Sequence, residues 1–206
     1  MKKNDLYVYT ALSLAIFIPI PGRLAYGLII IMMLYVLSIL GILFRKLSSM
    51  FFDNGIHSVL IAVMLIFLSI LIRQFLIIYS PVIALVLGIT IYAPALSAFV
   101  LGYLYRKSGL NLGASIKIAF FKCNAFAVFS LLFFSIRDLL GYGTISLPGP
   151  SGLIEFHIVK ENALSFLGFF FASIPGAMIL LAVLLAVITL VMKKMEIYAT
   201  SRRIEK

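Results

Sequence analysis

The sequence predicts an all-α integral membrane protein with six transmembrane helices, and three observations support this class. The chain has 206 residues, of which 64% are hydrophobic and 12% are charged, whereas a soluble domain carries about 25% charged residues. Apolar runs of about 20 residues, the length that crosses a bilayer, recur along the chain. Lysines and arginines gather in short clusters between these runs, where they act as topology signals for membrane helices. We therefore expect one transmembrane domain over residues 1–206.

The net charge of +10 would favour a nucleic-acid partner in a soluble protein. Here the positive charges are separated by the apolar runs, and this distribution excludes a continuous basic surface. We predict membrane lipids, and no nucleic acid, as the surroundings of the chain.

Six apolar segments follow one another, each bounded by charged or turn-forming residues. The first is short and ends in a turn that contains Pro19, Pro21 and Gly22. The fifth is followed by the longest loop, residues 139–162, which contains the turn-rich sequence SLPGPSG. The predicted spans are residues 6–20, 25–44, 58–78, 82–105, 114–136 and 163–192.

Two of these spans are predicted to be broken. Pro94 lies in the middle of the fourth span, in the stretch LGITIYAPALSAFVLG, where it removes a backbone donor and disfavours helix at Ala93. The first span ends in its own proline turn. Non-helical backbone at membrane depth survives only inside protein or beside a water-filled cavity. The Pro94 stretch is therefore the predicted centre of the protein, and Pro175 with Gly176 predicts a further kink in the sixth span.

Six spans divide into two sets of three, and an odd number in each set inverts the second set relative to the first. We predict a first repeat over residues 1–80, a second over 81–192, and a cytoplasmic tail over 193–206. The matching positions of the two broken helices, the first of each set, support this division.

The distribution of basic residues predicts the orientation. With six spans both termini share one face, and 12 of the 17 lysines and arginines fall there. They are Lys2, Lys3, Arg45, Lys46, Arg106, Lys107, Lys117, Lys193, Lys194, Arg202, Arg203 and Lys206. By the positive-inside rule, both termini are expected in the cytoplasm of a multi-pass protein of the inner (plasma) membrane. The loop 139–162 is then expected outside.

The fifth span and its loop resemble a known family. The piece SIRDLLGYGT, residues 135–144, is similar to a Ser-Leu-Arg-Glu-(Ile/Leu)-(Ile/Leu)-Gly-x-Gly-Thr pattern of the integral membrane subunits of the Rnf and Nqr complexes. Residues 154–157, Ile-Glu-Phe-His, resemble a segment of the same loop, and Pro175-Gly176-Ala177 resembles the last helix. The stretch 87–102 is similar to the family's Leu-Gly-Ile-x-Ile-Pro segment.

The resemblance is nearest to the RnfE or NqrD type of subunit, which implies a role in complexes that couple electron transport to ion transport. It also implies an assembly with a paralogous six-helix subunit and further subunits. In the family, one cysteine from each broken helix contributes to a shared iron-sulfur cluster. The resemblance places Ala15 and Ala98 at these two positions, with Ser97 beside the second, and an alanine cannot bind iron.

The chain is therefore expected to bind no cofactor by itself, and a partner subunit would carry iron-sulfur or flavin groups. Its only cysteine, Cys123, falls on a different span and is expected to be a packing residue. No phosphate-binding loop, nucleophile with a base, or nicotinamide fingerprint is present, so at most the chain is a non-catalytic subunit of an enzyme. Glu155 and His157 alone make a poor metal site.

Six residues are candidates for an ion pathway or for docking. Arg73 and Lys122 are cations inside predicted spans, where such residues are rare and often functional. The alternative for both is that the long side chain extends to the membrane interface. Arg137 and Asp138 belong to the resembling motif. The other two, Pro94 and Ser97, lie in the broken fourth span.

Two other functions stay open on the sequence alone. One is a small-molecule transport protein, such as the substrate-binding membrane component of an energy-coupling transporter, which has similar size, basicity and a short first helix. The other is a membrane anchor for a peripheral enzyme. The favoured function is a scaffold or ion-path subunit resembling those of the Rnf and Nqr complexes.

Overall fold

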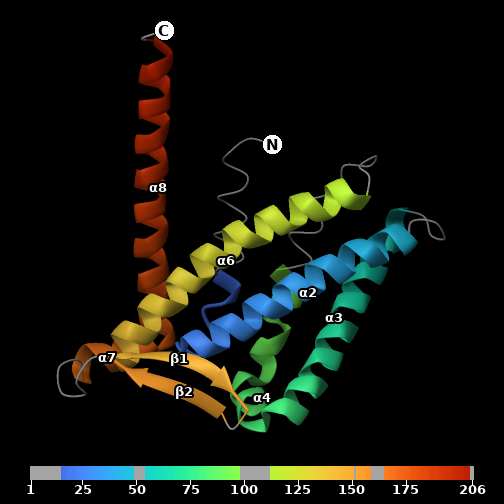
Figure 1. Ribbon diagram of the computed structural model, residues 1–206, viewed down its shortest axis with the longest axis horizontal. Helices are drawn as coiled ribbons and strands as arrows, with labels where there is room; N and C mark the ends of the chain where they lie inside the picture. Colours follow the sequence, from blue (N-terminus) through green and yellow to red (C-terminus); the bar gives the residue numbers. More distant parts are fainter. Residues whose placement is uncertain (1–14, 49–53, 98–111, 151, 159–164, 205–206) are drawn as a thin grey trace.

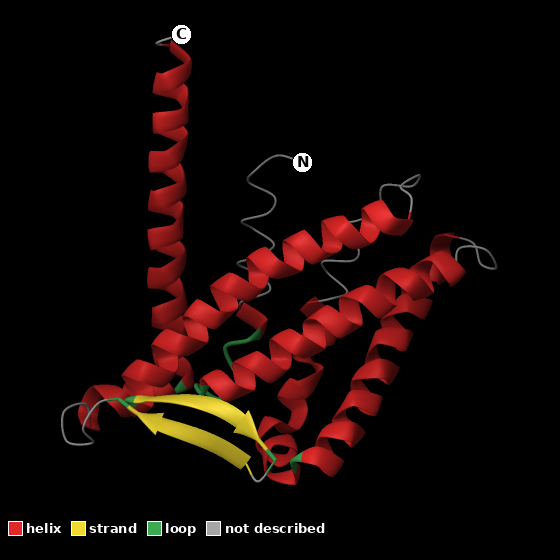
Figure 2. Cartoon of the chain, in the orientation of Figure 1, coloured by secondary structure: helices red, strands yellow, loops and turns green. Residues whose placement is uncertain are grey.

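The computed structural model describes residues 15–48, 54–97, 112–150, 152–158 and 165–204, and shows a helical bundle with one β-hairpin at its end (Figures 1 and 2). The long helices are α2 (Leu24–Ser48), α3 (Asn54–Tyr79), α6 (Leu112–Tyr142) and α8 (Ile174–Ile204). The shorter elements are α4 (Pro81–Leu87), the 3-10 helix η1 (Gly88–Tyr92), β1 (Thr144–Gly149), β2 (Gly152–His157) and α7 (Ser165–Ala172).

Four helices within this described part are long and apolar enough to cross a membrane, as expected of an all-α membrane protein. The candidate spans cover Leu24–Ser48, Val59–Tyr79, Leu112–Tyr142 and Ile174–Val191. They correspond to the predicted second, third, fifth and sixth spans. The first predicted span falls largely on residues 1–14, outside the described residues, so the number of six spans stays a prediction.

The fourth predicted span is interrupted, although not at Pro94 itself. An apolar helical stretch runs over Pro81–Ser97, and within it α4 gives way to the 3-10 helix η1 before helix resumes at Ala93. The interruption begins at Gly88, whose φ of 47° lies in the left-handed region that glycine adopts without a steric penalty. Ala93 donates its N–H to the carbonyl of Thr90, the group that the Pro94 ring excludes from an α-helical bond.

The segment predicted as one sixth span is two helices. It divides at Ser173, between α7 and α8, two residues before Pro175. Pro175 lies in the first turn of α8, where a missing N–H costs nothing because that donor has no helical partner. The charged tail continues α8 as helix to Ile204.

The loop predicted over residues 139–162 begins later than expected and contains two strands, while its predicted end at residue 162 lies outside the described residues. Helix α6 continues to Tyr142, and the loop then folds into an antiparallel hairpin in which Thr144 pairs with His157 and Gly149 with Gly152. Figure 1 shows this hairpin lying across the end of the bundle where α2 and α4 begin and α6 ends. The hairpin thus closes one end of the helical layer.

The core lies between α2 and α6, which run side by side. Phe17, from the turn before α2, packs edge-on against Phe126 of α6, with ring centres 5.3 Å apart. Gly27 of α2 leaves the space that the ring of Phe134 fills. The turn of residues 15–23 is therefore packed inside the bundle, next to α6.

Candidate functional site

The candidate site is a buried polar cluster at the hairpin end of the bundle, formed around the last turns of α6. Arg137 and Asp138 are 1% and 0% exposed, so the structure buries two adjacent ionisable side chains of the resembling motif. Neighbouring residues on a helix point about 100° apart. The two side chains accordingly bind different segments, and we call this cluster the Arg137–Asp138 frame.

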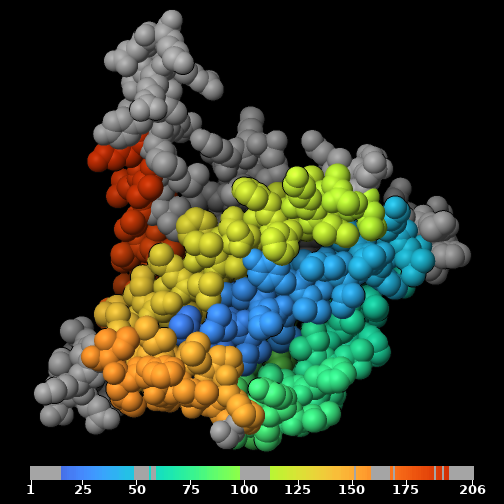
Figure 3. Space-filling view, in the orientation of Figure 1, coloured from blue at the N-terminus to red at the C-terminus, as the bar shows by residue number. Residues whose placement is uncertain are grey.

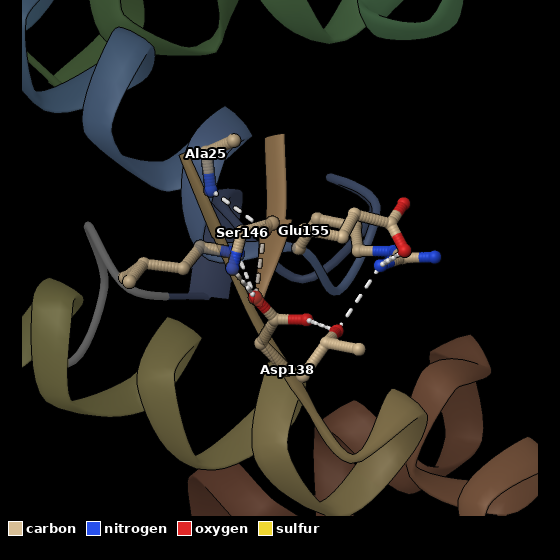
Figure 4. A network of polar contacts seen from close by, with 7 residues as sticks. Ala25, Asp138, Ser146 and Glu155 are labelled. Atoms are coloured by element: carbon tan, nitrogen blue, oxygen red, sulfur yellow. Dashed lines mark hydrogen bonds and ion pairs between the residues drawn. The ribbon is translucent and has the colours of Figure 1, made fainter. Parts of the chain in front are cut away.

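The carboxylate of Asp138 accepts four hydrogen bonds, which converge on it in Figure 4. On β1, the Thr144 hydroxyl donates to Oδ1 at 3.0 Å, while the Ser146 hydroxyl and N–H donate to Oδ2 at 2.7 and 2.8 Å. The fourth donor is the N–H of Leu24, the first residue of α2, at 3.1 Å. A buried carboxylate is stable only when its oxygens are satisfied in this way.

The bond to Leu24 makes Asp138 a cap supplied from a distant part of the chain. The first N–H groups of a helix have no partner within the helix, and the helix dipole favours a negative charge beside them. The next N–H of α2, that of Ala25, is bound by the Ser146 hydroxyl oxygen at 3.2 Å. Asp138 and Ser146 thereby fix the start of α2 to the hairpin.

Arg137 binds two breaks in the helical backbone. Its Nη1 donates to the carbonyls of Ile18 and Ile20 at 3.2 and 2.6 Å, in the turn before α2. Its Nε and Nη2 donate to the carbonyls of Phe171 and Ala172 at 3.3 and 3.0 Å, at the end of α7. Carbonyls at a helix C-terminus lack helical partners and favour a cation.

The guanidinium is held by backbone oxygens, since all four of its hydrogen bonds go to carbonyl groups. A planar fork of five donors suits four carbonyls that approach from two sides, whereas the single nitrogen of a lysine does not. Space for the fork depends on Gly22, because a Cβ there would lie 2.8 Å from Nε of Arg137.

A third charged residue, Arg23, joins the outer edge of the frame to the hairpin. Its Nη1 lies 3.0 Å from Oε2 of Glu155 on β2 and donates to the Thr144 hydroxyl at 3.1 Å. Its guanidinium carbon lies 3.9 Å from the ring centre of Tyr142, a cation–π contact. Glu155 therefore joins β2 to the start of α2 through this ion pair.

The structure brings together only part of the predicted residues. Arg137 and Asp138 form the frame, and Lys122 lies on the same helix 15 residues earlier, about 22 Å away along the axis. Within the described residues, no hydrogen bond or ion pair joins the frame to Arg73 or Ser97.

Those two residues instead retain unsatisfied polar atoms. Ser97 is fully buried, and its hydroxyl has no partner among the described residues. The same holds for Nε of Arg73, on a half-buried side chain of α3. Ala15 is exposed at the start of the described residues, and Ala98 lies outside them.

Cys123 is buried between α2 and α6, where its thiol lies 3.4 Å from the Ser38 hydroxyl. Within the part of the chain that the structure describes, no three His, Cys, Asp or Glu side chains form a group that could hold a metal ion.

Sequence reasoning missed Thr144, Ser146 and Arg23 as parts of the frame. A signal for the hairpin was present, because apolar and polar residues alternate in Ile145-Ser146-Leu147 and again over residues 154–157, as in half-buried strands. The proline- and glycine-rich turn between these two pieces favoured a loop, so the two strands were not predicted.

Neither family models, nor curated proteins, nor solved structures show a match to this chain. The four candidate spans of the described residues are compatible with a helical membrane protein, and the functional argument rests on the frame and the helix breaks.

Proposed function

We propose that this chain is a membrane subunit of a multi-subunit complex that resembles the ion-translocating Rnf and Nqr complexes. In this proposal it has six spans in two inverted repeats. It acts as a scaffold or ion-path component without an iron-sulfur cluster of its own, beside a paralogous six-helix subunit.

One observation carries the proposal: Arg137, in the motif that resembles the family, binds the non-helical backbone before α2. In membrane proteins, irregular backbone occurs inside the protein, and broken helices near the centre of inverted repeats form substrate and ion sites. A buried arginine that holds such a break makes it a fixed part of the architecture.

The interruption at Gly88 supports the proposal from the other half of the chain. It lies in the fourth predicted span, the first of the second repeat, and so corresponds in order to the turn of residues 15–23 in the first. Two interrupted segments in matching positions are the pattern expected of inverted repeats.

The proposed orientation places the hairpin outside the cell and residues 45–54 and 193–206 in the cytoplasm. The alternating directions of α2, α3 and α6 support the placement of the end of α2 and the start of α6 on the same side, since both lie at the opposite end of the bundle from the hairpin (Figure 1). The choice of that side as cytoplasmic rests on the basic residues. A reporter fused after Pro150 should be active only outside, and activity in the cytoplasm would reverse the orientation.

The direct test is purification of the tagged chain from native membranes in a mild detergent, with iron, flavin and subunit composition measured. We expect a paralogous membrane subunit and subunits with flavin or iron-sulfur groups in the complex. The chain expressed alone should carry no iron above background. Stoichiometric iron on the isolated chain would refute the absence of a cluster, and co-purified ATPase subunits would replace the proposal with the small-molecule transporter.

A further inference from the structure

Helix α3 carries an exposed stripe of branched side chains that contains one arginine. Its apolar members, all isoleucine or valine, are between 38% and 64% exposed. The members recur at alternating spacings of three and four residues. They are Ile56, Val59, Val63, Ile66, Ile70, Arg73 and Ile77, and we call this set the Arg73 stripe.

This spacing is the pattern by which two helices pack against each other along a left-handed seam. Valine and isoleucine are stiff at χ1, so they lose little freedom when a second helix covers them. The neighbouring exposed face of α3 differs, because Phe67, Leu71, Phe75 and Ile78 stand there. The stripe therefore has the spacing and the stiffness of a seam for a second helix.

The described residues leave the isoleucine and valine members of the stripe exposed, whereas Arg73 is half-buried. Of the four candidate spans, Val59–Tyr79 is the least buried, with 11% of its apolar window inside the structure. In Figure 3 α3 forms a margin of the described chain, with α2 beside it. Its inner face, which includes Leu65 and Ser69, packs on α2 and α4 and does not include the stripe.

Arg73 supplies the charge that identifies the occupant. Its Nε is buried without a hydrogen-bond partner among the described residues. The candidate spans contain one acidic residue, Asp138, and its carboxylate already accepts four hydrogen bonds. An arginine at membrane depth pairs with a carboxylate or with backbone carbonyls. The carbonyls of a continuous helix are already bonded within that helix, so a covering helix can pair with Arg73 only through an acidic side chain.

The position of Arg73 argues against a lipid phosphate as its partner. Arg73 lies six residues before Tyr79, about 9 Å below the hairpin end of α3. Side chains on a helix point toward its N-terminus, which on α3 is the opposite end. The Cα–Cβ bond of Arg73 is therefore directed toward the middle of the membrane, and the guanidinium reaches the nearer headgroups only if the side chain turns back toward Tyr79.

We propose that the Arg73 stripe binds a transmembrane helix of a partner subunit, and that this helix presents an aspartate or glutamate at the level of Arg73. The inference rests on the proposed function in a multi-subunit membrane complex. The branched side chains supply the packing seam, and the ion pair fixes its register, as a single polar residue does in a coiled coil.

The test compares Arg73→Glu with Leu71→Glu in the complex purified from native membranes. Leu71 is two residues away, hence about 200° around the helix at nearly the same depth, so it controls for a carboxylate placed in the membrane. We expect Arg73→Glu to lower the ratio of partner subunits to this chain by at least about tenfold. Leu71→Glu should change that ratio less than about twofold.

Arg73→Lys, which keeps the charge, should retain the partner subunits. If Arg73→Glu does not fold, Arg73→Met is the informative variant, because it removes the charge and keeps the apolar stem. Folding is checked by the resistance of buried Cys123 to a thiol-reactive dye.

A photoreactive benzoylphenylalanine at Ile70 should crosslink to the partner helix, and the same probe at Leu71 to lipid. Substitution of arginine for the carboxylate in the crosslinked helix should restore the complex with Arg73→Glu. The inference is wrong if Arg73→Glu keeps the full set of subunits, or if the Ile70 probe labels only phospholipid or another segment of the same chain. In those outcomes the complex itself persists, whereas wild-type protein that purifies without other subunits refutes the proposed function.

Discussion

Replacement of Asp138 with alanine removes the acceptor that joins α2, α6 and β1. Two backbone donors, the part-buried N–H of Leu24 and the buried N–H of Ser146, lose their partner. Each unsatisfied buried donor costs about 1–3 kcal/mol, while the hydroxyls of Thr144 and Ser146 can rotate to other acceptors at lower cost. We therefore expect Asp138→Ala to lower the free energy of unfolding by roughly 3–5 kcal/mol.

Asparagine separates the geometry of this site from its charge. Asp138→Asn keeps one carbonyl oxygen and remains a good helix cap, but it loses the charge that favours the start of α2. The expected loss is about 1–2 kcal/mol, clearly less than that of the alanine variant.

Cys123 provides the assay, because it is the only cysteine and is buried. A thiol-reactive fluorescent dye should label it only when the bundle opens, so labelling against denaturant in detergent micelles follows unfolding. Equal losses for the alanine and asparagine variants would refute the cap argument. A loss below about 1 kcal/mol for Asp138→Ala would show that the four bonds contribute little.

Two further predictions use the same assay. Arg137→Lys should lower the free energy of unfolding by roughly 2–4 kcal/mol, since one ammonium cannot reach the carbonyls of both breaks. A free energy of unfolding within about 0.5 kcal/mol of the wild-type value would contradict this role of Arg137. Gly88→Ala should cost about 1–2 kcal/mol through its positive φ alone, because an added Cβ meets nothing within 4 Å. Gly113→Ala, also in open space but in α6 without a positive φ, is the control and should be neutral or slightly stabilising.

The sequence resolved the long helices better than their connections. Charge clusters and the lengths of the apolar runs predicted the ends of α2 and α3 to within a few residues. The sixth span was predicted as one kinked helix, whereas the chain forms two helices there. Pro175 indicated a break in that segment, and the chain divides two residues earlier because a proline is tolerated in the first turn of a helix.

Of the candidate site, the sequence identified Arg137 and Asp138 but not what they bind. Leu24 is 114 residues from Asp138, and Ile20 is 117 residues from Arg137. Local pattern contains no information on contacts of that range. Thr144 and Ser146 were missed for the same reason, since a hydroxyl near a turn is ordinary until a carboxylate is placed beside it.

The sequence by itself determined that this chain forms long apolar helices with basic clusters between them, because partition into a bilayer depends on the length and composition of each segment. Only the tertiary structure decided that α6 ends in a frame joining the first break, the start of α2, the hairpin and the end of α7. Those bonds exist because packing brings unsatisfied helix ends next to one buried cation and one buried anion.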